Sequence, residues 1–219
     1  MATARPRRVD YSESTRKALV NGAVVLFTER GYAGTSLDEV CKRARVTKGA
    51  LYHHFSGKQG LFEAAFDAVE QDMLGRLAEI VAQPGDVWQT SLEGLRAYLQ
   101  VCLEPAYQRI VLHEGPVVMG YEAWKQAEER FSFGLVRTAV SGLIDSGLIG
   151  EVPEEPMARL LFGALAGGAT MIVAAEDQKK ASEEIGRCIE SVVTGLRALK
   201  ETGWTDCSVG AGGGSTTGQ

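Results

Sequence analysis

A group of residues suited to contact with nucleic acid lies in one short basic stretch. The group consists of Thr47, Lys48, Gly49, Tyr52 and His53. Hydroxyls, a cation and rings at the start of a helix fit the phosphate backbone and the base edges in a major groove. Gly49 has no side chain, which would let the backbone approach the groove closely. The stretch therefore predicts a DNA-reading surface.

Helix-start signals around this stretch must position it. Ser36 with Glu39 forms a capping box, which predicts a helix that begins directly after Ser36. Thr47 is a good N-cap residue, and Ser56 with Gln59 repeats the box pattern. We expect two short helices over residues 37–44 and 48–54, and a long one from about residue 57 to residue 83.

Apolar stripes indicate that the short helices pack against a third helix that precedes them. Leu51 and Phe55 are spaced i,i+4 and form one such stripe. The segment 14–30 has an apolar face of its own, made of Ala18, Leu19, Ala23, Leu26 and Phe27. Three helices with one small core and the reading residues outside form a helix-turn-helix domain.

The charge is divided between two parts of the chain. Residues 1–60 contain 11 Lys and Arg against 5 Asp and Glu, whereas residues 61–219 contain 12 against 23. The overall net charge of −5 hides this asymmetry. Such a division is expected when only the N-terminal part meets DNA.

Cysteine, histidine and hydropathy patterns argue against several other classes of protein. Cys41, Cys102, Cys188 and Cys207 are scattered without a C-x-x-C pair, which indicates a reducing cytoplasm. Only His113 lies outside the reading stretch, and no H-x-x-x-H, Walker loop or G-x-S-x-G occurs. No apolar run approaches the roughly 20 residues that a membrane-spanning helix needs. We therefore expect no enzyme, no metal site, no cofactor and no membrane.

The rest of the sequence predicts further helices and no strand, so the expected fold class is all-α. A long helix should join the helix-turn-helix domain to a larger helical domain. The further helices are expected over residues 88–104, 106–113, 117–145, 154–175 and 179–200. The expected divisions are an N-terminal basic segment at 1–12, the helix-turn-helix domain at 13–60, a helical regulatory and dimerisation domain at 61–204, and a flexible tail at 205–219. The basic segment is either a floppy tail or an arm that lies along DNA.

The last two expected helices have unusual faces. Residues 154–175 include Gly163, Gly167 and Gly168, which are costly inside a helix but allow close approach of another helix. Residues 179–200 carry a broad apolar stripe. Paired across a two-fold axis, both would form a four-helix interface; alternatively, both stripes fill the core of the monomer.

Residues 19–66 resemble the DNA-binding domain of the TetR/AcrR family of bacterial transcriptional regulators. The similar positions are Phe27, Gly31, Tyr32, Thr35, Ser36, Val46, Lys48, Gly49, Leu51, Tyr52, His54, Phe55, Lys58 and Leu61. The resemblance implies a homodimer whose two domains occupy successive major grooves of a palindromic operator. It also implies a small-molecule site in the larger domain.

Carried over by position, the resemblance assigns roles to individual residues. Thr35 or Ser36 and Tyr52 would hold phosphates, and Lys58 would meet the backbone. Thr47, Lys48 and Gly49 would approach bases, with His53 near the groove. Arg45 stands in the tight turn where the family usually has glycine, and we hypothesise that it adds a phosphate contact.

The candidate ligand-binding residues are polar and aromatic side chains spread over residues 88–147, because ligand sites combine an apolar lining with a few polar groups. They are Tyr98, Cys102, Tyr107, Arg109, His113, Met119, Tyr121, Trp124 and Phe131. His113 and Trp124 are the first choices. Ordinary core packing or a surface position is the alternative for each of them.

The sequence as a whole predicts a sequence-specific, cytoplasmic transcriptional repressor. A small molecule would release it from its operator by moving the long helix that leaves the reading domain. Regulation by cysteine oxidation or by a partner protein is one alternative, with Cys207 as the reactive thiol. An architectural DNA-binding protein without an effector is another.

Overall fold

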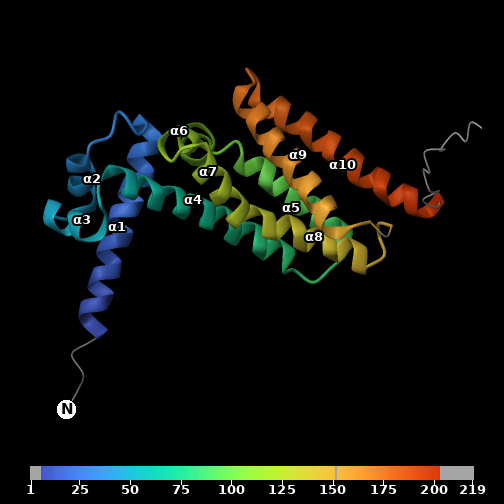
Figure 1. The fold of residues 1–219 in the computed structure, drawn as a ribbon, viewed down its shortest axis with the longest axis horizontal. Helices are drawn as coiled ribbons and strands as arrows, with labels where there is room; N and C mark the ends of the chain where they lie inside the picture. Colours follow the sequence, from blue (N-terminus) through green and yellow to red (C-terminus); the bar gives the residue numbers. More distant parts are fainter. Residues whose placement is uncertain (1–5, 151, 203–219) are drawn as a thin grey trace, which may run out of the picture.

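The computed structural model describes residues 6–150 and 152–202, and these residues form helices without a strand (Figure 1). The fold is all-α. Two segments, η1 and η2, are π-helical. The elements are α1 (Pro6–Arg30), α2 (Leu37–Ala44), α3 (Lys48–His54), α4 (Lys58–Val81), α5 (Val87–Val101), η1 (Tyr107–Glu114), α6 (Gly115–Val118), α7 (Tyr121–Glu128), η2 (Glu129–Phe133), α8 (Gly134–Asp145), α9 (Glu154–Ala174) and α10 (Gln178–Thr202).

Helices α1 to α3 and the start of α4 form an N-terminal unit around one apolar core. Leu19, Phe27, Val40, Leu51 and Phe62 are completely buried there. Two of the three predicted caps are present: the Ser36 capping box is complete, and the Thr47 side chain accepts a hydrogen bond from the Ala50 N–H at 3.2 Å. The predicted box of Ser56 with Gln59 is wrong, because the N-cap of α4 is Gly57 and no side chain caps this helix. The helix-turn-helix prediction is confirmed, and the two short helices have the predicted ends at residues 37–44 and 48–54.

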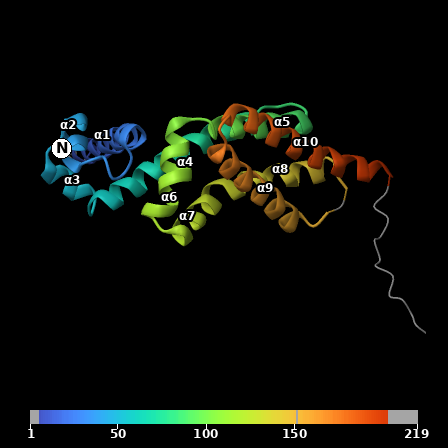
Figure 2. The same ribbon diagram turned by 90° about the horizontal axis from the view of Figure 1, so that it is seen from above.

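Helix α4 leaves this unit and continues into the larger domain (Figure 2). It packs against α1 at one end and against α5, η1 and η2 along its length. Helices α5, α8, α9 and α10 complete the larger domain, with α9 between α8 and α10. The same rigid element thus contributes to both cores, because Phe62 and Met73 of α4 are each fully buried.

Two of the expected boundaries were wrong. The chain breaks at Gly120, whose φ is +83°, and not at Gly115-Pro116. Pro116 lies in the first turn of α6, where its missing N–H costs no helix hydrogen bond. Helix α1 begins at Pro6, within the segment 1–12 that was expected to lie outside the helical domain. Residues 1–5 and the predicted tail at 205–219 lie outside the described residues.

Helix α9 leaves much of its apolar surface open to solvent. Leu160 and Met171 of α9 are 70% and 64% exposed, and Val192 of α10 is 58% exposed. By length and composition alone, α9 is long and apolar enough to cross a membrane. Of its most apolar stretch, 22% is buried inside the molecule. The prediction that no apolar segment approaches the length of a membrane-spanning helix therefore missed α9. The alternative that α9 and α10 only fill the monomer core does not account for these exposed residues.

Candidate nucleic-acid interface and regulatory cavity

The predicted reading residues lie together on α3 and its N-cap. Thr47, Lys48, Gly49, Tyr52 and His53 are all exposed. The Lys48 ammonium pairs with the Asp38 carboxylate at 2.6 Å, and this contact raises the pKa of Lys48. Both side chains are more than 60% exposed, so the pair holds them only weakly. The N-terminus of α3 therefore presents a cation, a hydroxyl and a ring on one open surface.

Arg45 has the left-handed backbone that the turn was expected to need, with φ 57° and ψ 42°. Among residues 6–150 and 152–202, no other non-glycine residue has a positive φ. The turn is closed by a hydrogen bond from the Val46 N–H to the Cys41 carbonyl at 3.0 Å. The Arg45 side chain is exposed, and its phosphate contact stays a prediction.

The expected phosphate contact of the Thr35 side chain is wrong. The Thr35 hydroxyl is buried and donates toward the carbonyl oxygens of Gly31, at 2.9 Å, and Leu26, at 3.1 Å. A hydroxyl held inside the turn cannot face DNA. Ser36 remains exposed, although its hydroxyl is engaged with Glu39 in the capping box.

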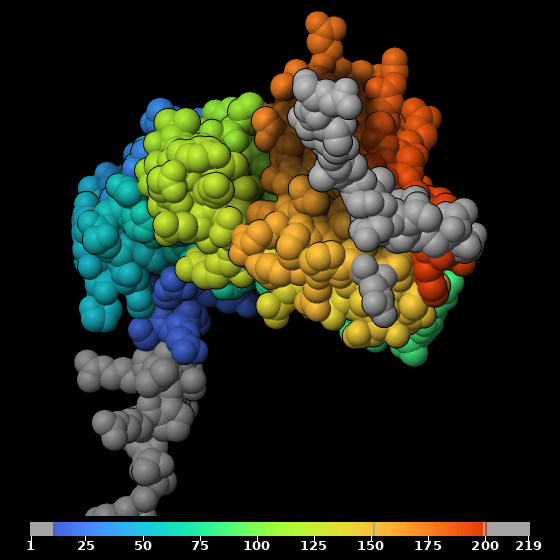
Figure 3. Space-filling view, turned by 45° about the vertical axis from the view of Figure 1, so that its right-hand side comes forward, coloured from blue at the N-terminus to red at the C-terminus, as the bar shows by residue number. Residues whose placement is uncertain are grey.

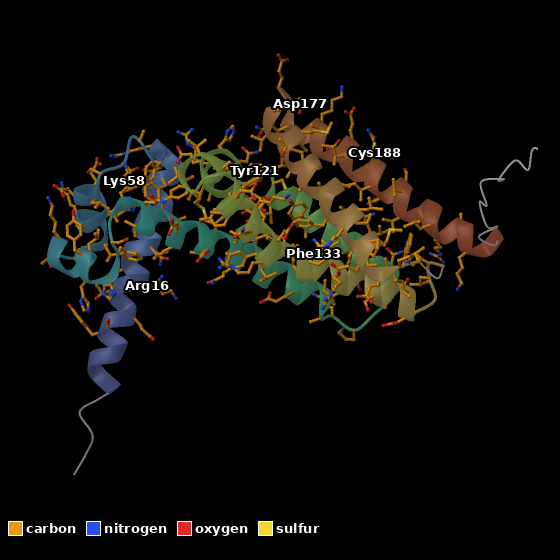
Figure 4. All side chains as sticks on the ribbon, viewed as in Figure 1. Arg16, Lys58, Tyr121, Phe133, Asp177 and Cys188 are labelled. Atoms are coloured by element: carbon orange, nitrogen blue, oxygen red, sulfur yellow. The ribbon has the colours of Figure 1, made fainter. Side chains whose placement is uncertain are left out.

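Lys58 lies at the junction between the two domains (Figure 4). Its ammonium sits 4.4 Å from the centre of the Tyr32 ring. The Tyr32 N–H donates to the Glu114 carboxylate of η1 at 2.7 Å, and Arg109 Nε lies 3.3 Å from the same carboxylate. A side chain from the larger domain thus holds the turn after α1. Figure 3 shows the adjoining yellow-green and blue surfaces of these two regions.

A mostly apolar cavity of about 140 Å³ lies inside the larger domain. Residues of α4, α5, η2, α8, α9 and α10 line it. Helix α4 contributes Met73, Leu77 and Val81, which follow one another at single-turn spacing. The polar lining side chains are Ser91, Tyr98 and Ser132.

The structure separates the nine predicted ligand-binding residues. Tyr98 lines the cavity, and Tyr107 lies behind it with the two ring centres 6.5 Å apart. Cys102 is buried beside Tyr98, and burial raises its pKa to about 12. The remaining six do not line this cavity; they are Arg109, His113, Met119, Tyr121, Trp124 and Phe131.

The two first choices lie near the domain junction. Trp124 donates its indole N–H to the Val111 carbonyl at 2.9 Å, and its ring packs against Gly115. His113 is exposed on η1. Trp124 therefore fastens α7 to η1, and neither residue faces the cavity.

Two buried carboxyl groups lie beside the cavity, and the sequence analysis missed both. Glu70 of α4 is completely buried, and Glu128 at the end of α7 is 9% exposed. Burial, with repulsion from Glu128, raises the pKa of Glu70 to about 8. Burial raises the pKa of Glu128 to about 7. A signal for Glu70 existed, because it falls between Phe66 and Met73 on the apolar stripe of α4.

Comparisons with known proteins agree with this arrangement. Residues 19–65 match the family described as bacterial regulatory proteins, tetR family, and residues 88–196 match the tetracyclin repressor-like C-terminal domain. A TetR-family transcriptional regulator from Pectobacterium atrosepticum is 34% identical, with a TM-score of 0.76 over 85% of this chain and 96% of its own. The chain belongs to the TetR family. It is therefore a DNA-binding transcriptional regulator of the repressor type and not an enzyme.

Other TetR-family relatives extend the likeness. The Transposon Tn10 TetC protein of Escherichia coli is 29% identical over 69% of this chain and 76% of its own length. The crystal structure of RolR with its ligand resorcinol has a TM-score of 0.65 at 16% identity, over 91% of this chain and 100% of its own. That likeness shows the TetR fold alone. The helix-turn-helix unit and the larger helical domain thus belong to one shared architecture.

Proposed function

We propose that this chain is a homodimeric repressor that binds a palindromic operator and leaves it when a small molecule occupies the cavity. The observation that carries this proposal is the course of α4. Its Lys58 end adjoins the Tyr32 turn of the DNA-reading domain, and its Met73, Leu77 and Val81 form a wall of the cavity. A ligand that displaces this wall moves the element on which the reading domain is mounted.

The exposed apolar faces of α9 and α10 support the dimer. Leu160, Met171 and Val192 would be buried against a second copy of the chain, together with the small residues of α9. Two reading domains held by such an interface would meet two half-sites of one operator. A regulator of bacterial DNA acts in the cytoplasm, where its operator is.

Besides α4, a second connection joins the larger domain to the DNA-reading domain. Glu114 accepts the Tyr32 N–H, so η1 holds the turn between α1 and α2 directly. Movement of η1 would shift this turn independently of any bend in α4. A coupling free energy of about 1–3 kcal/mol between ligand and operator is enough for a useful switch.

Oxidation of the buried thiols is a poorer switch than a ligand. Burial raises the pKa of both Cys41 and Cys102, which leaves little reactive thiolate at neutral pH. Cys188 is exposed on α10 (Figure 4), and Cys207 lies outside the described residues. Peroxide treatment is therefore expected to leave operator binding unchanged in a Cys188→Ser, Cys207→Ser variant.

The test has two stages. Selection of bound DNA from a random pool should yield a palindrome, and a small-molecule library should then contain compounds that release this DNA. Nitroxide labels at Glu29→Cys, in the variant without Cys188 and Cys207, should report a changed distance between the two reading domains on release. DNA without a common sequence would indicate an architectural protein. An unchanged distance with a verified inducer would contradict the proposed movement.

A further inference from the structure

The cavity is almost entirely apolar, and its few polar side chains lie at different places in the lining. Ser91 donates its hydroxyl to the Val87 carbonyl at 2.8 Å, within its own helix. Tyr98 and Ser132 also line the cavity, and both lie near Glu70 and Glu128. Glu70 is one turn before Met73 on α4, and Glu128 is one turn before Ser132. Residues one turn apart share a helix face, so both carboxyl groups lie toward the cavity.

Glu70 is unusual because it is fully buried without a satisfied carboxyl group. Neither Oε1 nor Oε2 has a hydrogen-bond partner of normal geometry among the described residues. The hydroxyls of Tyr107 and Ser132 lie near enough to lower its pKa in part, against the larger effect of burial. An unpartnered buried carboxyl group costs free energy, and a bound donor would remove that cost.

The surroundings of the two carboxyl groups are acidic or neutral. The titratable groups that act on Glu70 are Glu128 and Asp67, with the Tyr107 hydroxyl, and Asp67 is already paired with Arg130 at 3.1 Å. Tyr98 and Cys102 face the same space and are held neutral by burial. No cation is among the groups that shift either glutamate. An anionic ligand would therefore find no cation here to pair with.

The local backbone is also irregular around these groups. Tyr107 begins η1, and Glu128 directly precedes η2, which carries Ser132. π-helical turns are rare and occur frequently at functional sites. Figure 4 places Phe133, the last residue of η2, in the middle of the larger domain.

We propose that the cavity binds a small lipophilic amine, with its hydrocarbon part against the apolar wall and its ammonium group donating to Glu70 and Glu128 past Tyr98 and Ser132. This inference rests on the proposed function, in which the same cavity holds the effector. A metal ion fits less well, because the described residues contain no group of three His, Cys, Asp or Glu that could hold one. The volume of about 140 Å³ suits a body of about the size of benzene.

Three probes of one size and different charge test the proposal. Benzylamine, benzyl alcohol and benzoate are titrated into the full-length dimer by calorimetry at pH 6. We expect benzylamine to bind at least tenfold more tightly than benzyl alcohol, and benzoate not to bind. Titration in buffers of different ionisation enthalpy should show that binding of benzylamine releases about one proton. The proton comes from the carboxyl pair, because the ammonium group favours its ionised form.

Two variants locate the contact. Glu70→Gln should weaken benzylamine at least tenfold and leave benzyl alcohol within twofold. Glu79→Gln removes an exposed carboxylate from the same helix and should change neither affinity. Ala139→Leu fills part of the cavity and should weaken both ligands.

The outcomes separate this inference from the proposed function. If benzyl alcohol or benzoate binds at least as well as benzylamine and also releases operator DNA, the cavity is an effector site but the amine proposal is wrong. Benzylamine affinity that is unchanged in Glu70→Gln overturns the proposal in the same way. If none of the three binds up to the limit of its solubility while operator binding is intact, the amine proposal is wrong, and the library screen then tests ligand release separately.

Discussion

The two domains treat buried polar groups in opposite ways. In the N-terminal unit, the buried Thr35 hydroxyl is placed to donate to two carbonyl oxygens, and the caps at Ser36 and Thr47 are complete. In the larger domain, the fully buried carboxyl group of Glu70 lacks a partner of normal geometry and lies beside an empty space. A domain that must fit DNA in one geometry needs a satisfied core. A domain that must respond to a ligand can keep an unsatisfied group that the ligand completes.

The largest expected effect comes from removing the charge of Glu70. Because its pKa rises from 4.5 to about 8 in the folded chain, the folded state binds the proton more tightly. Unfolding releases this proton between these two pH values, so stability falls as the pH rises through that window and levels off above it. Glu70→Gln should therefore stabilise the protein by up to about 4 kcal/mol at pH 9 and by little at pH 5. Urea unfolding at pH 5, 7 and 9 measures the difference.

Glu79→Gln is the matched control for that experiment, since Glu79 is exposed on the same helix. It should leave the pH profile of the parent unchanged. Equal stabilisation by Glu70→Gln at pH 5 and pH 9 would contradict the raised pKa. Such a result would also remove the contrast between the two cores.

A second prediction concerns a substitution that disrupts the junction between the domains. Gly31 has φ +74°, and a Cβ there would lie 2.4 Å from Arg109 Nη2 and 2.5 Å from Glu114 Oε1. Gly31→Ala should cost about 1–3 kcal/mol of stability and reduce the effect of an inducer on operator affinity. Unfolding experiments and operator titrations with and without inducer measure both quantities.

Gly120→Ala separates backbone strain from loss of the junction. Gly120 also has a positive φ, of +83°, but a Cβ there meets nothing within 4 Å. This variant should lose about 1 kcal/mol of stability and keep the full inducer effect. Equal loss of induction in both variants would show that the Glu114 contact carries no coupling.

A smaller effect is expected on the DNA-reading surface. Lys48→Ala should weaken operator binding by about 1–3 kcal/mol if Lys48 reads a base, with relaxed preference at one position of the site. If Lys48 contacts only a phosphate, the slope of log operator affinity against log salt concentration should fall by about 1, and the base preference should stay the same. Asp38→Asn frees Lys48 from its ion pair and should strengthen binding. A decrease in Asp38→Asn would mean that the pair positions Lys48 for contact.

The DNA-reading domain was the easier part to predict because its determinants are local. The caps at Ser36 and Thr47 and the left-handed turn at Arg45 depend on residues within one or two turns of themselves. The boundary at Gly120 was missed because Gly115-Pro116 looks like a stronger break in sequence. Pro116 is accommodated only because α6 happens to begin there.

The cavity was harder to predict because it depends on the packing of helices far apart in sequence. Trp124 was expected to contact a ligand, but it packs at the junction. Glu70 lies among apolar residues of α4, and it was not singled out from the sequence. Its position on the apolar stripe of α4 was the only local signal, and its burial depends on the packing of η1 and η2 against α4.

The smallest effect concerns Arg45, where local strain and DNA contact can be separated. A left-handed backbone at a non-glycine residue costs about 1–2 kcal/mol of stability, which glycine would not incur. Glycine also has a more flexible unfolded state, which costs about 0.5–1 kcal/mol and offsets part of this gain. Arg45→Gly should therefore stabilise the protein by about 1 kcal/mol or less, measured by urea unfolding. If Arg45 contacts a phosphate, the same variant should lower the salt slope of operator binding by about 1. Arg45→Asn tolerates the turn without the charge, so it should reproduce the lower slope, and an unchanged slope in both would leave Arg45 with a structural role alone.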